Sequence, residues 1–232
     1  MPDFAVILPA AGRSTRFGSP ISKLFQLLHG KPVLSWTVEA FAQRDDVQQI
    51  VIATSDPDAV RASLGQLSRN TVSKVKITPG GSCRADSVRL GALASRDSIE
   101  WLAVHDAARP LVSQALVDRT FAAAQTHGCA AAALPVHLTI KEARGPLPAQ
   151  VTKTLPRHQL WAMQTPQVMR RADLLEAFKT CPIPLDQVTD DVQLLELAGK
   201  PVWLVEGEER NLKITTPMDL EVAGAFLKAG AG

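Results

Sequence analysis

The chain has 232 residues, of which 46% are hydrophobic, 5% aromatic and 21% charged, and its formal net charge is +2. The apolar content and the low net charge exclude a disordered chain and allow one large or two small domains with a core. The chain has 25 Lys and Arg residues against 23 Asp and Glu residues, so there is no broad basic excess and we expect no nucleic-acid partner. The longest apolar run, residues 129–136, contains Pro135 and is too short to span a bilayer, so we expect no membrane partner.

The N-terminus and the cysteines indicate where the protein works. The chain starts Met-Pro-Asp-Phe and lacks the basic start and long apolar core of a secretory signal. Cys83, Cys129 and Cys181 are odd in number and show no CxxC spacing, which predicts free thiols. We therefore expect a cytoplasmic globular protein, and an enzyme.

Short apolar runs alternate along the chain with helix-like amphipathic stretches. The runs predict strands over 4–8, 50–53, 75–78, 101–105, 130–134 and 202–205, and the stretches predict helices near 32–43, 58–68, 84–95, 113–127, 170–179 and 190–198. Asp56 before Pro57 predicts one helix start, and Thr216-Pro-Met-Asp219 predicts a capping box at the start of the last helix. This order predicts an α/β fold with a mostly parallel twisted sheet and helices on both faces.

Residues 137–157 interrupt this alternation. Two short alternating runs flank a Gly-Pro-Leu-Pro turn at 145–148, which predicts a β-hairpin. The hairpin is either a surface excursion or an arm that packs on a second subunit, since an isolated hairpin is only marginally stable. With no linker or internal repeat, we expect one domain, 1–232, with an inserted arm at about 137–158.

Three segments that follow predicted strands carry groups for binding anions. Residues 9–18 are rich in small residues and include Arg13 and Arg16, and Lys23 follows them. This composition predicts a phosphate site, and the alternative is an ordinary turn. The segment lacks the endings of a Walker loop and the glycine spacing of a dinucleotide fingerprint. Residues 80–87 form a second glycine turn, which holds a nucleotide or simply connects a strand to a helix.

The third segment, residues 104–110, supplies a carboxylate. Asp106 is a hard oxygen ligand suited to Mg²⁺, or alternatively a helix cap, and Arg109 can form two hydrogen bonds to a phosphate or carboxylate. We interpret His105 as a hydrogen-bonded structural residue. Further polar residues in apolar contexts, at 160–167, 189–191 and 211–215, suggest a lined cleft, with Thr189 most simply a helix N-cap.

In this order the segments resemble the 2-C-methyl-D-erythritol 4-phosphate cytidylyltransferase family of the sugar-phosphate nucleotidyltransferases. The matching stretches are 10–16 with Lys23, 80–88, 104–112, 139–141, 160–167, 189–191 and 211–220. Each motif is weak alone, but seven in register from residue 5 to about 224 are specific. The resemblance implies a Rossmann-like sheet with a dimerisation arm. It also implies a Mg²⁺-dependent reaction of CTP with 2-C-methyl-D-erythritol 4-phosphate that gives 4-diphosphocytidyl-2-C-methyl-D-erythritol and pyrophosphate, in non-mevalonate isoprenoid biosynthesis.

This reaction needs cations more than a general base. The second pKa of a phosphate monoester lies near 6, so the acceptor oxygen is largely ionised at neutral pH. The anions must instead be neutralised, aligned and stabilised as charge develops.

The resemblance also implies roles for individual residues, and it implies a homodimer because the arm reaches the partner's site. The implied roles are Arg16, Lys23 and Lys213 for catalysis; Ala10, Ala11, Gly12, Gly81 and Ser87 for the nucleotide; Arg109, Thr139, Arg157, Thr165 and Thr189 for the sugar phosphate; and Asp106 and Asn211 for the metal.

The chain departs from the family pattern at Ser14, Ser22, Leu24 and Pro156. These departures bear on the geometry of the first loop and on the polyol contacts, while Lys23 is kept. Two alternatives remain open. A ribitol 5-phosphate cytidylyltransferase would differ in the acceptor pocket, around Arg157 and Thr165. A non-catalytic nucleotide-binding regulator could share the same fold, but it would be expected to lack the cationic and metal positions.

Overall fold

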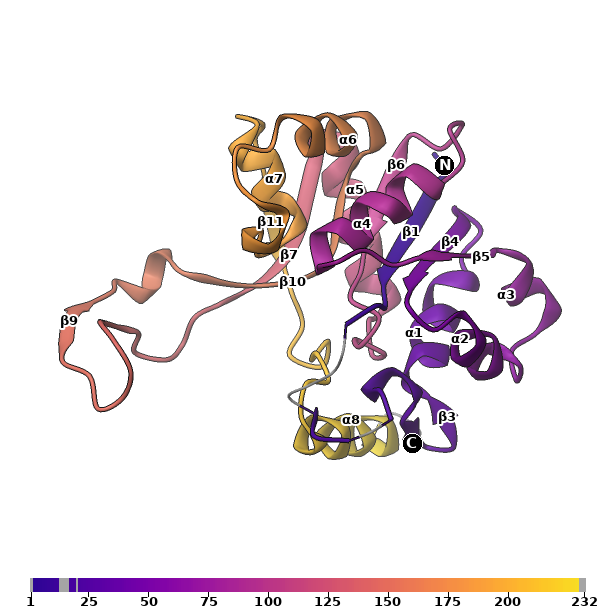
Figure 1. Ribbon diagram of the computed structural model, residues 1–232, viewed down its shortest axis with the longest axis horizontal. Helices are drawn as coiled ribbons and strands as arrows, with labels where there is room; N and C mark the ends of the chain where they lie inside the picture. Colours follow the sequence, from indigo (N-terminus) through magenta and orange to yellow (C-terminus); the bar gives the residue numbers. More distant parts are fainter. Residues whose placement is uncertain (1, 13–16, 20, 230–232) are drawn as a thin grey trace.

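The computed structural model describes residues 2–12, 17–19 and 21–229, and within them a seven-stranded sheet forms the centre of the molecule (Figure 1). The strands, in spatial order, are β11 (Trp203–Glu206), β7 (Cys129–Pro135), β10 (Trp161–Arg170), β6 (Trp101–Val104), β1 (Phe4–Pro9), β4 (Val47–Thr54) and β5 (Val75–Pro79). Neighbouring strands are parallel except β10, which runs antiparallel to both β6 and β7. The predicted mostly parallel α/β sheet is confirmed.

Helices cover both faces of the sheet, as the sequence predicts. They are α1 (Val33–Ala42), α2 (Pro57–Leu64), α3 (Arg69–Ser73), α4 (Arg84–Ala94), α5 (Gln114–His127), α6 (Arg171–Thr180), α7 (Asp191–Leu197) and α8 (Pro217–Ala229). Along β1, Phe4, Val6 and Leu8 pack into a core with α1 and α5, whereas Ala5 and Ile7 pack into a second core with α4, α6 and α7. A strand buried on both faces has a continuous apolar sequence, which is why the sequence predicts β1.

Strand β10 is absent from the elements that the sequence predicts. Gln164, Thr165 and Pro166 interrupt its apolar pattern, and its pairing with β7 shifts register between Met163 and Gln167. The irregularity buries Gln164 and Thr165 at the middle of the sheet, where their polar atoms find hydrogen-bond partners on other segments. Tertiary contacts rather than local pattern therefore determine this strand.

The predicted hairpin is present. Strands β8 (Lys141–Ala143) and β9 (Val151–Thr154) pair antiparallel in a sheet of their own, and they project from the body of the molecule (Figure 1). Both strands are exposed along their whole length. The role of the hairpin as a dimerisation arm remains a prediction.

The helix starts agree with the sequence in two cases and differ in one. Asp56 accepts from the Ala59 backbone N–H at 2.9 Å, and Asp219 accepts from the Thr216 N–H at 2.7 Å in the predicted capping box. The prediction of Thr189 as an N-cap is wrong by one residue, because Asp190 caps α7 by accepting from the Gln193 N–H. Within the described residues no helix is long and apolar enough to cross a membrane.

Candidate functional site

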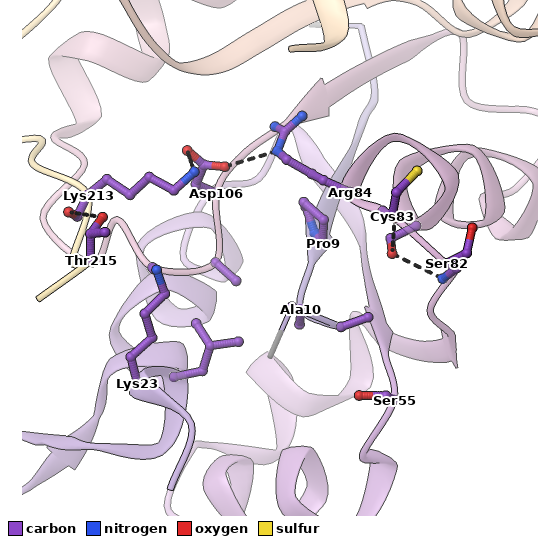
Figure 2. Close-up of a pocket in the computed structure, with 17 residues that line it drawn as sticks. Pro9, Ala10, Lys23, Ser55, Ser82, Cys83, Arg84, Asp106, Lys213 and Thr215 are labelled. Carbon is purple, nitrogen blue, oxygen red and sulfur yellow. Dashed lines mark hydrogen bonds and ion pairs between the residues drawn. The ribbon is translucent and has the colours of Figure 1, made fainter. Parts of the chain in front are cut away.

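A cavity of about 560 Å³ opens at the carboxyl ends of β1 and β6, the edge at which an open α/β sheet binds its ligands (Figure 2). Its walls are formed by the loop after β1, Ser55 after β4, the glycine turn that starts α4, the loop after β6, and residues 213 and 215. A short 3-10 helix, η2 (Lys23–Phe25), adds the Lys23 side chain. The lining residues include Ala10, Ala11, Gly12, Lys23, Gly81, Arg84, Ser87, Asp106 and Lys213.

Asp106 is the anionic centre of this cavity. Its Oδ2 accepts from Arg109 Nε at 3.0 Å and pairs with Lys213 Nζ at 3.0 Å, and its Oδ1 accepts from Arg84 Nε at 3.3 Å. Burial raises the pKa of this carboxyl, but Arg84, Lys213 and Arg109 together outweigh burial and hold the pKa well below its ordinary value. Asp106 is therefore a carboxylate at any pH at which the protein works.

His105 is structural, as interpreted from the sequence. It is fully buried, its Nε2 donates to the Arg109 carbonyl at 3.1 Å, and its Nδ1 accepts from the Thr165 hydroxyl at 3.0 Å. Thr165 Oγ1 in turn accepts from the Asp106 N–H at 3.0 Å. Burial lowers the pKa of His105 to about 4, so the ring is neutral and fixes the loop that carries Asp106.

Arg109 and Asn211 lie behind Asp106 rather than on the cavity wall. Arg109 is 8% exposed, and its Nη1 donates to the Asn211 carbonyl at 2.7 Å. Asn211 is fully buried, and its Nδ2 donates to the Thr165 carbonyl at 2.7 Å and to Gln164 Oε1 at 3.3 Å. Within the described residues its Oδ1 has no hydrogen-bond partner. A buried acceptor without a donor is costly, so this oxygen is a candidate ligand for a cation.

The glycine turn is held close to the loop after β1. The Gly81 N–H donates to Ser87 Oγ at 3.0 Å, and the Ser87 hydroxyl donates to the Cys83 carbonyl at 2.9 Å. A Cβ on Gly80 would meet Ala11 Cβ at 2.3 Å, and a Cβ on Gly81 would meet Asp86 Oδ2 at 2.3 Å. Glycine at position 80 lets the turn approach Ala11 closely, glycine at position 81 makes room for the Asp86 side chain, and Ser87 shapes the turn through its hydroxyl.

Lys23 and Lys213 approach the cavity from the side opposite the glycine turn (Figure 2). Lys213 belongs to a segment fixed by the hydrogen bond from the Ile214 N–H to the Ala108 carbonyl at 2.9 Å. With 35% of its side chain exposed, Lys213 faces the cavity while it pairs with Asp106. Arg16 lies outside the described residues, so its predicted role is not addressed by the structure.

None of the five predicted acceptor-binding residues is among those that line this cavity. Thr139 and Arg157 are exposed on the projecting segment, where Arg157 Nη1 donates to the His137 carbonyl at 2.6 Å. Thr189 is also exposed, and its N–H and hydroxyl both donate to Gln193 Oε1. Thr165 and Arg109 both contact Asp106, and both of their side chains are buried behind the cavity wall.

Sequence reasoning missed Arg84 and Asp191 as members of the site. Arg84 Nη2 pairs with Asp191 Oδ2 at 2.8 Å, so this guanidinium joins Asp191 to Asp106. One signal was available: Arg84 is the first residue of α4, and a cation at a helix N-terminus is opposed by the helix dipole. An arginine there needs carboxylate partners, although the sequence does not say which.

A family model described as 2-C-methyl-D-erythritol 4-phosphate cytidylyltransferase matches residues 4–229. A relative of that name from Gloeobacter violaceus is 43% identical over 225 residues, covering 96% of this chain and 95% of the relative. A bifunctional enzyme IspD/IspF from Desulfotalea psychrophila is 39% identical over 98% of this chain, which spans only 58% of that protein's length.

Solved structures agree with these sequence matches. The 2-C-methyl-D-erythritol 4-phosphate cytidylyltransferase of Thermus thermophilus is 34% identical with a TM-score of 0.78, over 97% of this chain and 99% of that one. The enzyme of the same name from Francisella tularensis is 30% identical with a TM-score of 0.82, over 96% and 99% of the two chains. The likeness therefore extends over the fold and nearly the whole sequence.

Proposed function

The chain belongs to the 2-C-methyl-D-erythritol 4-phosphate cytidylyltransferase family and is a nucleotidyltransferase, and we propose that it joins CTP to 2-C-methyl-D-erythritol 4-phosphate in the cavity around Asp106. A phosphate oxygen of the acceptor attacks the α-phosphorus of CTP. The bond from that phosphorus to the oxygen bridging the α- and β-phosphates breaks, and pyrophosphate leaves with the electron pair. The product is 4-diphosphocytidyl-2-C-methyl-D-erythritol, an intermediate of non-mevalonate isoprenoid biosynthesis.

The observation that carries the proposal is the pair of lysines facing the glycine turn across the cavity. The reaction brings several negative charges together and moves charge onto the leaving oxygen, so preorganised cations stabilise its transition state. Lys23 would neutralise the CTP phosphates, with Arg16 as a second cation of the same loop. Lys213 would contact the α-phosphate, because its ammonium already lies 3.0 Å from Asp106 at the cavity wall.

The nucleotide would bind along the two backbone loops. Ala10, Ala11, Gly12 and Gly81 line the cavity, and their small size would let phosphate and base atoms approach the backbone there. The Ala10 and Gly81 N–H groups already donate to the Ala53 carbonyl and to Ser87 Oγ, so they shape the surface and do not bind the nucleotide themselves. The N-terminus of α4 adds its positive dipole end to the same wall. Ser87 supports this surface by holding the Gly81 N–H.

We propose Asp106 and Asn211 as the protein ligands of Mg²⁺. Asp106 is ionised, so its oxygens are hard anionic ligands that a metal ion would share with Arg84, Arg109 and Lys213, and Asn211 Oδ1 lacks a donor within the described residues. In the part of the chain that the structure describes, no three or more His, Cys, Asp or Glu side chains cluster as metal ligands. Two protein ligands are enough for Mg²⁺, which takes one or two carboxylates together with phosphate oxygens and waters. When bound, the metal ion would add positive charge where the phosphates gather.

The acceptor would be held by two chains. Arg109, Thr165 and Thr189 belong to the body that carries the cavity, whereas Thr139 and Arg157 lie on the projecting hairpin segment and outside the cavity of their own chain. We propose a homodimer in which the 137–158 arm brings Thr139 and Arg157 to the partner's acceptor site. The unpaired state of all three cysteines supports a cytoplasmic location.

Pyrophosphate release from CTP tests the acceptor directly. We expect release with 2-C-methyl-D-erythritol 4-phosphate and Mg²⁺, and little release with ribitol 5-phosphate under the same conditions. Faster release with ribitol 5-phosphate would transfer the assignment to that acceptor. Binding of CTP without release with either acceptor would show a non-catalytic nucleotide-binding protein.

A further inference from the structure

We propose that Asp191 is a positioning residue for the cytidylyl transfer: it holds the Arg84 guanidinium on Asp106 and so fixes the carboxylate on which Lys213 is aligned. This inference rests on the proposed function. It concerns a fully buried carboxylate that does not line the cavity.

Arg84 connects three segments that are distant in sequence. It is the first residue of α4, its Nε donates to Asp106 Oδ1 at 3.3 Å, and its Nη2 donates to Asp191 Oδ2 at 2.8 Å. The contact to Asp191 is the shorter one, and Asp191 is fully buried while the Arg84 side chain is 28% exposed. Asp191 is therefore the fixed end of the contact, and Arg84 is the end that reaches the cavity (Figure 2).

Asp191 is itself held rigidly to the central sheet. The backbone N–H groups of Asp191 and Val192 donate to Gln167 Oε1 at 2.9 and 3.2 Å, and Gln167 Nε2 donates to Asp190 Oδ2 at 3.0 Å. Gln167 lies on β10, which pairs directly with β6, the strand that leads to Asp106. The two carboxylates that share Arg84 are thus anchored on adjacent strands.

The arrangement suits orientation better than substrate binding. Arg84 places one guanidinium nitrogen on each carboxylate, and a forked group of this kind holds direction as well as charge. Without Asp191, Arg84 would keep only its longer contact to Asp106, and its freed nitrogen could turn toward the phosphates in the cavity. Asp106 and Lys213 would then lose their fixed alignment, and small misplacements of catalytic groups cost up to about 10²-fold in rate.

The test compares Asp191→Asn with Asp186→Asn in steady-state pyrophosphate release. Asp186 is exposed on the short 3-10 helix η4 (Leu185–Gln187) and takes no part in the contacts of Arg84 or Gln167 described above, so the control makes the same chemical change outside the network. We expect Asp191→Asn to lower kcat about 10-fold or more while the KM for CTP changes about 3-fold or less. Asp186→Asn should keep both values close to wild type.

A double variant separates positioning from folding. The double variant Arg84→Gln, Asp191→Asn removes both charges of the pair together, so Asp191 is not left as a buried carboxylate without its arginine. The kcat of the double variant should equal that of Arg84→Gln alone, because the two residues act as one unit. A wild-type kcat in Asp191→Asn would overturn the inference. So would independent, multiplying losses in the double variant, or a kcat loss that only follows the folded fraction in thermal melts. A wild-type chain that releases no pyrophosphate would overturn the proposed function and this inference with it.

Discussion

Lys213 illustrates how one side chain can be important for chemistry and dispensable for folding. It is partly exposed, and without it Asp106 keeps the two arginine partners Arg84 and Arg109. We therefore expect Lys213→Ala to fold normally and to lose about 10²–10³-fold in turnover, the effect of removing a preorganised charge stabiliser. Pyrophosphate release at saturating CTP measures the turnover, and Lys228→Ala, which changes an exposed lysine of α8, is the control. Full turnover in Lys213→Ala would remove the lysine from the mechanism.

Cys129 should be much less reactive than Cys83 and Cys181, although all three cysteines are unpaired. Burial in β7, aided by the negative charges of Asp173, Asp190 and Glu196, raises the pKa of Cys129 to about 12. At neutral pH this thiol has about 10³-fold less thiolate than an ordinary cysteine, so alkylation of the folded protein should spare it. Peptide mapping after iodoacetamide should find the partly exposed Cys83 and Cys181 modified in the folded protein, and Cys129 only in denaturant. Equal rates at Cys83 and Cys129 would contradict this.

At the scale of elements, the packing of α4 on β1 is close enough to exclude a methyl group. Gly91 is buried in α4, and a Cβ there would meet Ile7 Cγ2 at 2.5 Å. Gly91→Ala should therefore lower the free energy of unfolding by about 1–3 kcal/mol through overpacking, despite alanine's better helix propensity. Denaturant unfolding measures the change.

A second glycine provides the matched control. Gly224 lies in α8, and a Cβ there would have its nearest neighbour, His29 Nε2, at 3.6 Å, an ordinary contact. Gly224→Ala should raise the free energy of unfolding by about 0.5–1 kcal/mol, as expected for alanine in an unstrained helix. If both substitutions stabilise the protein, the close approach of α4 to β1 does not exclude a methyl group at position 91.

The elements that were predictable are those whose burial shows in their own sequence. Strand β1 is buried on both faces and has a continuous apolar sequence, and the caps at Asp56 and Thr216 are local hydrogen bonds. Strand β10 is missed because Gln164 and Thr165 are buried polar residues whose partners, which include Glu208 and His105, come from distant segments. No periodicity within a strand encodes partners of that kind.

The same distinction applies to the site. The sequence alone points to Asp106 because it is a carboxylate that follows a strand, and the family resemblance points to Lys213; both line the cavity, and their roles remain predictions. The pairing of Arg84 with Asp191 could not be predicted, since 107 residues separate them and their contact exists only once α4 and α7 pack on the same face of the sheet. The sequence therefore predicts residues that line the cavity better than it predicts the contacts that orient them.

At the scale of the whole molecule, the projecting arm is the feature that a single chain does not explain. The arm is exposed, it carries Thr139 and Arg157, and neither residue lines the cavity of its own chain (Figure 1). If the arm acts on a partner, each site uses Lys213 from one chain and Arg157 from the other chain. Arg157→Ala and Lys213→Ala then remove residues that belong to different chains. Each variant alone should be nearly inactive, but a mixed dimer contains one site with both residues intact.

Mixing the two variants after subunit exchange therefore tests the dimer and the trans contact together. With equal amounts and random pairing in a two-fold dimer, half of the dimers are mixed and one of their two sites is whole. We expect activity to return to about a quarter of the wild-type value, and sedimentation of the wild type should give a dimer at micromolar concentration. A mixture that stays inactive despite exchange, or an active monomer, would place Arg157 in its own chain's site.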